Sequence, residues 1–329
     1  MKRWLPILII IAILFVPGLV LPRFGTGAVT ASVSVRPEVL FTLGGIEISN
    51  TLLTSWIVVL LLVLFAYLST RNMRMIPSGL QNVMETIVEA LDGLATSVAG
   101  ERGRKFFPIV ATIFLFVLFS NLLGLVPGFG PIGIIPVDEH TPAPQGITTF
   151  DLPVSLAHSL GGGNAPAEGE NVVLAPFFRS PSTDVNMTLA LALISVLMTQ
   201  VFGMQALGPI RYWFARFFMF GKLGDFVGSL FKGKLKWGLL AFGFLDVFIG
   251  ILELVSEVSK ILSFTFRLFG NIFAGEVVLL IMAFLFFALP FPFYALEIFV
   301  GFIQAFVFAI LTLVFMTIAT TAHGAEEHH

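Results

Sequence analysis

The 329-residue sequence contains no cysteine and few charged residues. Without cysteine there is neither a disulfide framework nor a reactive thiol. Charged residues make up only 12% of the chain, against about 25% in an average soluble domain, while hydrophobic residues make up 57%. This composition predicts an integral membrane protein. The net charge of -2 gives no indication of nucleic-acid binding.

The motifs of nucleotide and metal enzymes are also missing from the sequence. There is no GxxxxGK[ST] phosphate loop, no HExxH pair and no aspartate-rich cluster. An intramembrane enzyme would need a nucleophile with its base, or a metal cluster, and the sequence shows neither. We therefore expect no catalytic site within this chain, no cofactor and no metal.

Long apolar runs predict an all-α integral membrane protein with about five to six membrane helices and one interfacial amphipathic helix. The chain is expected to begin with a signal peptide or N-terminal anchor at 1–31 and an external segment at 32–50. Two membrane helices follow within 51–127, with a cytoplasmic amphipathic helix at 77–98 between them, and then an external Pro/Gly-rich loop at 128–184. The remainder consists of a membrane helix and basic cytoplasmic loop at 185–237, a tilted helical hairpin at 238–322 that carries the proton path, and a cytoplasmic tail at 323–329. Cleavage and retention of 1–31 both stay open.

The amphipathic helix predicted at 77–98 has two stripes. The apolar stripe consists of Val83, Ile87, Ala90 and Leu94, and the acidic stripe of Glu85, Glu89 and Asp92. Such a pattern is typical of a surface helix with a solvated acidic face. Before the membrane helix at 185–207, Ser182-Thr183-Asp184 form a helix-capping cluster. We expect Asp184 to be the cap, with a share in an external water-filled path as the second possibility.

The basic residues predict the orientation. Most of the 18 Lys and Arg residues fall in the segments that we place inside, and Arg23, Arg36 and Arg179 fall outside. Only Lys260 and Arg267 fall within the bilayer. By the positive-inside rule the C-terminus lies in the cytoplasm.

The last two helices are too long to stand upright in a bilayer. Residues 239–289 would measure about 76 Å as one helix and residues 292–322 about 46 Å, against about 30 Å of hydrocarbon. The first must tilt steeply, break or run along the interface. A strongly tilted pair joined at Pro290-Phe291-Pro292 is the simplest arrangement.

Arg267 lies inside the first of these runs, where an arginine costs at least about 3 kcal/mol and keeps its charge. At about 100° per residue, several polar residues share its face of the helix: Ser256, Lys260, Ser263, Asn271 and Glu253, with Asp246 and Glu257 at the margin. Glu276 falls on the opposite side. On the second helix Glu297, Gly301 and Gln304 share one face.

Two interpretations of this polar pattern are open. In the first, ion pairs hold a bundle together: Lys260 with Glu253 or Glu257, and Arg267 with Glu276 or Glu297. However, this many ionisable residues are too costly for packing alone. The second is a proton path in two halves, separated by a cation that cannot itself carry a proton. A stand-alone secondary transporter or channel, and a purely structural scaffold, remain alternatives.

Four segments carry a family resemblance: FVLFSNLLGLVP (116–127), PSTDVNMTLALAL (181–193), SKILSFTFRLFGNIFAGE (259–276) and QAFVFAILTLVF (304–315). Over residues 37–322 the chain resembles subunit a of rotary F-type ATP synthases. The resemblance implies a stator proton channel whose two half-channels couple proton translocation to rotation of the c-subunit ring, and thereby to ATP synthesis. It also implies b subunits of the peripheral stalk as partners and, as location, the bacterial cytoplasmic membrane.

The resemblance further implies roles for single residues. Arg267 matches the essential arginine that faces the c-ring carboxylate. The external half-channel would contain Asn271, Glu276, Glu297 and Gln304, with Asp184 as a further candidate. The cytoplasmic half would contain Ser263, Ser256 and Glu253, with Glu257, Lys260 and Asp246 as further candidates. Some family members have histidine where this chain has Glu297. The loop 128–181 is longer than the family's minimum, and the run 4–21 is an addition that many members lack.

Overall fold

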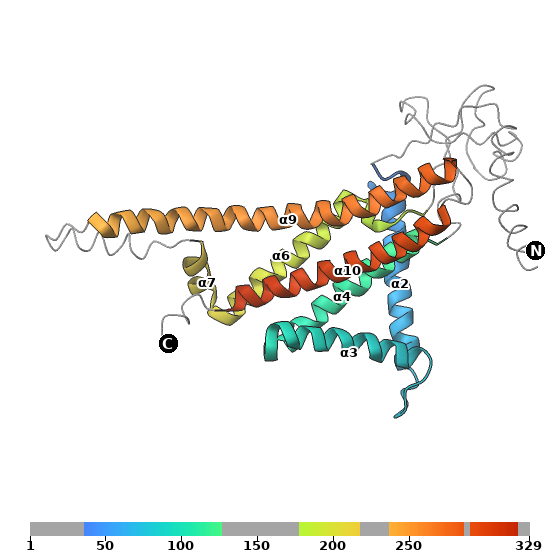
Figure 1. The fold of residues 1–329 in the computed structure, drawn as a ribbon, viewed down its shortest axis with the longest axis horizontal. Helices are drawn as coiled ribbons and strands as arrows, with labels where there is room; N and C mark the ends of the chain where they lie inside the picture. Colours follow the sequence, from blue (N-terminus) through green and yellow to red (C-terminus); the bar gives the residue numbers. More distant parts are fainter. Residues whose placement is uncertain (1–35, 127–177, 218–236, 286–289, 322–329) are drawn as a thin grey trace, which may run out of the picture. The chain divides into compact units, whose positions relative to one another are not determined.

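The computed structural model describes residues 36–126, 178–217, 237–285 and 290–321. The predicted signal peptide or anchor at 1–31, most of the external loop at 128–184, the basic stretch at 218–236 and the tail at 323–329 lie outside the described residues. Within the described part the elements are helices, apart from one two-stranded hairpin (Figure 1). The prediction of an all-α integral membrane protein is confirmed, with this small hairpin as an addition.

Four helical stretches of the described residues are long and apolar enough to cross a membrane. They are α2 (Asn50–Thr70), the stretch Leu80–Gly124, α6 (Val185–Leu207) and α10 (Pro290–Thr320). The second stretch consists of α3 (Leu80–Ala99), the short 3-10 helix η2 (Gly100–Arg102) and α4 (Gly103–Gly124). The bounds of α6 coincide with those expected from the sequence.

The longest element is α9 (Trp237–Leu285), with 49 residues. It contains no proline, the residue that most often kinks or breaks a helix. At the usual rise per residue it measures about 74 Å, more than twice the thickness of bilayer hydrocarbon. Of the three options left open for this segment, a break is therefore excluded over Trp237–Leu285. The strong tilt of α9 and α10 stays a prediction.

The chain divides into two compact units. The first takes residues from Met1–Tyr67, Leu115–Met187 and Leu268–Ala305, and the second from Leu68–Phe114, Thr188–Arg267 and Phe306–His329. Five helices contribute residues to both units: α2, α4, α6, α9 and α10.

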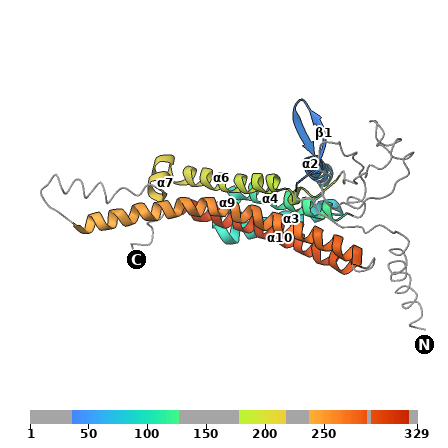
Figure 2. The same ribbon diagram turned by 90° about the horizontal axis from the view of Figure 1, so that it is seen from above.

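Near the start of the described residues, the first unit contains a β-hairpin that was not expected from the sequence. Strands β1 (Val39–Leu43) and β2 (Ile46–Ser49) pair antiparallel, and Figure 2 shows them projecting beside α2. Gly44 and Gly45 form the turn with φ angles of 58° and 88°, the left-handed values that a two-residue hairpin turn requires. After β2, the backbone N–H of Asn50 donates to the Glu38 carbonyl (2.9 Å), which ties the hairpin to the start of α2.

In the second unit, aromatic pairs hold the helices together. Phe264 of α9 packs against Phe308 and Phe315 of α10, with ring centroids 4.8 and 5.6 Å apart. Phe106 of α4 meets Phe202 of α6 edge to face at 5.0 Å.

Within the described part of the chain, helix α3 buries Gln81, Leu91 and Ala95, whereas Val83 of the apolar stripe is 48% exposed. The Gln81 side chain makes two hydrogen bonds with the backbone of Arg74. Of the acidic stripe, Glu85 and Glu89 are exposed and Asp92 is half-buried. An exposed apolar stripe is compatible with a helix that lies at the membrane interface, and that location stays a prediction.

Candidate functional site

Glu276 of α9 is paired with Arg179, which lies just before the short 3-10 helix η3 (Pro181–Thr183). Nη2 of Arg179 lies 3.0 Å from Oε2 of Glu276, and Nε donates to Oε1 and Oε2 at 3.1 and 3.2 Å. The arginine side chain is 6% exposed and the glutamate side chain 38%. Bidentate pairs of this kind fix geometry as well as charge. The partner considered for Glu276 at the sequence level was Arg267, and Arg179 was missed.

Glu297 of α10 lies in the first unit with Glu276, and it is 9% exposed. Its carboxylate packs against the backbone of Gly275, where a side chain would otherwise stand. Gly275 directly precedes Glu276, so the carboxylate of Glu297 packs on α9 next to the position of the other carboxylate predicted for the external path. Of the other two residues predicted there, Gln304 is half-buried and Asn271 is exposed.

Asp184 is a helix cap, as expected. Its Oδ1 accepts the backbone N–H of Asn186 at 2.8 Å, in the first turn of α6. Its Oδ2 accepts the hydroxyl of Thr51 at 2.8 Å, which ties α6 to the start of α2. Asp184 is 5% exposed, and Thr51 is fully buried. The side chain therefore has a structural role whether or not it also touches a water-filled path.

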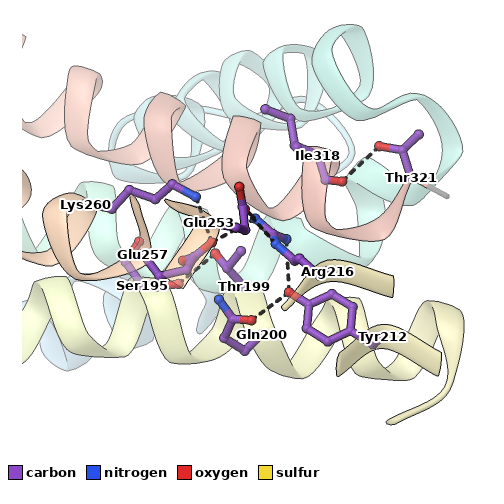
Figure 3. Close-up of polar contacts among 10 residues, drawn as sticks. All are labelled: Ser195, Thr199, Gln200, Tyr212, Arg216, Glu253, Glu257, Lys260, Ile318 and Thr321. Atoms are coloured by element: carbon purple, nitrogen blue, oxygen red, sulfur yellow. Dashed lines mark hydrogen bonds and ion pairs between the residues drawn. The ribbon is translucent and has the colours of Figure 1, made fainter. Parts of the chain in front are cut away.

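In the second unit, five side chains form what we name the Arg216 cluster: Tyr212 and Arg216 of α7 (Pro209–Arg216), with Glu253, Glu257 and Lys260 of α9 (Figure 3). Nη2 of Arg216 lies 2.7 Å from both Oε1 of Glu253 and Oε1 of Glu257. Nζ of Lys260 lies 2.8 Å from the same oxygen of Glu257. Two cations thus face two carboxylates, and the predicted Lys260–Glu257 pair is present.

Tyr212 completes the Arg216 cluster on the side of α6. Its hydroxyl accepts from Nη1 of Arg216 (3.0 Å) and donates to Oε1 of Gln200 (2.6 Å). Burial raises the pKa of Tyr212, against the opposing effect of Arg216. Burial by itself would lower the pKa of Arg216, but Tyr212, Glu253 and Glu257 together raise it. Arg216 is therefore a permanent cation, and Tyr212 a neutral hydroxyl, at any physiological pH.

Arg267 has an exposed side chain, and its Nη2 donates to Oγ of Ser263 at 3.3 Å. The two residues are four apart on α9 and share one face, as the helical spacing predicts. Ser256 and Asp246, assigned to the same face of α9, are both half-buried. Oε2 of Glu257 is buried and has no hydrogen-bond partner among the described residues.

Sequence reasoning missed the guanidinium partners because they lie far from α9 in the chain. Arg179 is 97 residues from Glu276, and Arg216 is 41 residues from Glu257. In the sequence, these two arginines indicate only orientation, through their positive charge. Among the described residues, no group of three or more His, Cys, Asp or Glu could hold a metal ion.

The chain is similar to known subunits of ATP synthases. A family model described as ATP synthase A chain matches residues 52–317. The ATP synthase subunit a 1 of Pelobacter propionicus is 31% identical over 265 residues, which cover 80% of this chain and 83% of the relative. Relatives named ATP synthase subunit a from Syntrophobacter fumaroxidans and Moorella thermoacetica are each 29% identical and cover 89% and 88% of this chain, or 91% and 98% of their own. These matches are consistent with the apolar helices and with the ionisable residues of α9. The chain belongs to the ATP synthase subunit a family.

Proposed function

We propose that this subunit a provides the stator side of the proton path, with Arg267 as the essential cation between an external and a cytoplasmic half-channel. The observation that carries the proposal is the order of groups on α9. One continuous helix bears the paired Glu253 and Glu257, then the exposed Arg267, then the paired Glu276. Carboxylates can take up and release protons, whereas a guanidinium cannot.

The external half-channel in this proposal contains Glu276 and Glu297, with Asn271 and Gln304 as polar neighbours. The half-buried Glu276 and the deeply placed Glu297 differ in their access to water, which suits successive steps of proton uptake. Asp184 is a cap first, and we assign it no step of its own.

The cytoplasmic half-channel contains Ser263, Ser256 and Glu253, with Asp246 nearer the start of α9. Glu253 is the better proton carrier of the Arg216 cluster because its side chain is 33% exposed, against 9% for Glu257. Glu257 and Lys260 bind each other, which favours a structural role for this pair.

The exposed side chain of Arg267 needs a partner of opposite charge, because a cation facing hydrocarbon is costly. In the proposal that partner is the membrane carboxylate of the c-subunit ring, with the b subunits as further partners in the complex. The chain would lie in the bacterial cytoplasmic membrane with its C-terminus in the cytoplasm.

The cycle follows from these charges. A proton from outside passes Glu297 and Glu276 and neutralises a c-ring carboxylate, which can then turn into lipid. When that carboxylate reaches the cytoplasmic half-channel, the cation of Arg267 favours its ionised form and the proton leaves past Ser263 and Glu253. Arg267 also prevents direct passage between the halves, since a fixed cation repels a hopping proton.

The test is replacement of Arg267 in the assembled ATP synthase, measured as ATP-driven proton pumping into inverted membrane vesicles. Arg267→Ala should abolish pumping, and Arg267→Lys should also fail because it lacks the planar guanidinium. Arg74→Ala is the control, since Arg74 is an exposed arginine outside α9, and it should pump normally. Normal pumping by Arg267→Ala would overturn the proposal. Rapid proton conduction by the purified chain without c subunits would favour a stand-alone channel instead.

A further inference from the structure

The position of Arg179 is fixed by two helices of the first unit. Its backbone N–H donates to Oγ1 of Thr54 in α2 at 3.3 Å, and the hydroxyl of the next residue, Ser180, donates to the carbonyl of Ser120 in α4 at 3.1 Å. Arg179, Ser180 and Thr54 are all buried. The guanidinium of Arg179 therefore extends from an anchored backbone and not from a free loop end.

Both oxygens of the Glu276 carboxylate are bound by this anchored guanidinium. The ring of Phe273, one turn before Glu276 on α9, lies under the guanidinium with its centroid 5.8 Å from Cζ. An arginine that lies over an aromatic ring and is bonded through two nitrogens has little freedom to turn. Lysine could supply the charge at this position but not the planar guanidinium that binds both carboxylate oxygens.

A second carboxylate lies within the electrostatic reach of Arg179. This is Glu38, directly before β1, whose pKa is raised by burial while Arg179 acts to lower it. Oε2 of Glu38 is buried without a hydrogen-bond partner among the described residues. The charge of Arg179 therefore acts on Glu38 as well as on Glu276.

We propose that Arg179 is a positioning residue of the external proton path, which holds the Glu276 carboxylate in the orientation from which it exchanges protons. The proposal rests on the function proposed above for Glu276. A glutamate side chain has three rotatable bonds, and proton transfer requires donor and acceptor within hydrogen-bond reach. By fixing both oxygens, Arg179 keeps the partly exposed carboxylate where a proton can reach it. Without the guanidinium of Arg179, the carboxylate of Glu276 remains in the path but is no longer held in this orientation.

A double-substitution cycle in the assembled ATP synthase tests the proposal, with the rate of ATP-driven proton pumping as the readout. Arg179→Gln should lower the rate at least about tenfold when Glu276 is present. In a Glu276→Gln background the same change should lower it by no more than about twofold, because the group being positioned is gone. Arg179→Lys should lower the pumping rate several-fold, because lysine keeps the charge but lacks the planar guanidinium that binds both carboxylate oxygens. Arg74→Gln, at an exposed arginine, is the control and should have no effect.

The outcomes separate the two proposals. Equal losses from Arg179→Gln in both backgrounds would mean a structural role and would overturn the positioning role. Normal pumping by Glu276→Gln would overturn the assignment of Glu276 to the path and leave the pair as packing. The content of the variant chain and of c subunits in the membranes is measured alongside. If Arg179→Gln fails to assemble, Arg179→Lys decides: unreduced pumping by that variant would overturn the proposal.

Discussion

The carboxylate of Glu297 occupies the space beside Gly275 that a Cβ atom at position 275 would take. The two residues belong to α10 and α9, and Gly275 directly precedes Glu276, the other carboxylate that we propose for the external path. A larger residue at 275 would have to displace this carboxylate, which is the flexible end of the Glu297 side chain.

The first prediction concerns this contact. Gly275→Ala should lower ATP-driven proton pumping at least about tenfold, because displacement of a transfer group by about 1 Å has effects of this size. Gly238→Ala is the control on the same helix, since a Cβ at 238 meets nothing within 4 Å. Pumping by Gly275→Ala that matched the Gly238→Ala control would show that the position of Glu297 is not critical.

The second prediction concerns the Arg216 cluster. Arg216→Gln leaves Glu253 and Glu257 with one cation between them, and the partly buried pair should lose on the order of 2 kcal/mol of local stability. Amide hydrogen exchange along α7 should then be about 30-fold faster in the intact complex. Arg211→Gln is the control, because Arg211 lies on α7 with an exposed side chain. Unchanged exchange in Arg216→Gln would mean that the ion pairs do not hold α7 on α9.

The third prediction separates the two roles considered for Asp184. Asp184→Ala removes the acceptor for Asn186 N–H and for the Thr51 hydroxyl, and should destabilise the first turn of α6 by about 1–2 kcal/mol. Asp184→Asn keeps an acceptor for the cap but cannot carry a proton, so it should pump normally. Hydrogen exchange at Asn186 and the pumping rate are the two measurements. Slow pumping by Asp184→Asn with a stable cap would place Asp184 on the proton path.

The fourth prediction is a pH dependence at Glu38. Because the folded-state pKa is raised above the ordinary value of 4.5, the unfolded chain releases this proton first as the pH rises. The contribution of Glu38 to the stability of the folded state is fully present at a pH below its ordinary pKa, and it is lost as the pH rises through its raised, folded-state pKa. Glu38→Gln should therefore stabilise the hairpin, relative to the native chain, more at about pH 8 than at about pH 4.

Hydrogen exchange of the β1 and β2 amides, corrected for intrinsic rates, measures this difference. Glu47→Gln on β2 is the control, since Glu47 is exposed. A difference between Glu38→Gln and the native chain that did not change with pH would contradict the predicted titration.

Periodic features were predictable from the sequence and long-range partners were not. The bounds of α6 and the shared face of Arg267 and Ser263 follow from apolar run length and helical spacing. The ion pair of Glu276 with Arg179 could not be predicted, because Arg179 lies in a segment without a periodic pattern. No spacing rule relates residues that are 97 positions apart. The hydrogen bonds between the Gln81 side chain and the Arg74 backbone were likewise beyond prediction, because helical periodicity describes only residues within the helix.

The unbroken course of α9 has a mechanical consequence. In a continuous α-helix each residue adds a fixed rise of about 1.5 Å along the axis and a fixed rotation of about 100° around it. Side chains along it can be exchanged one at a time, but one added or deleted residue between positions 253 and 276 would throw every later group out of phase. In this part of the chain, length is constrained more tightly than composition.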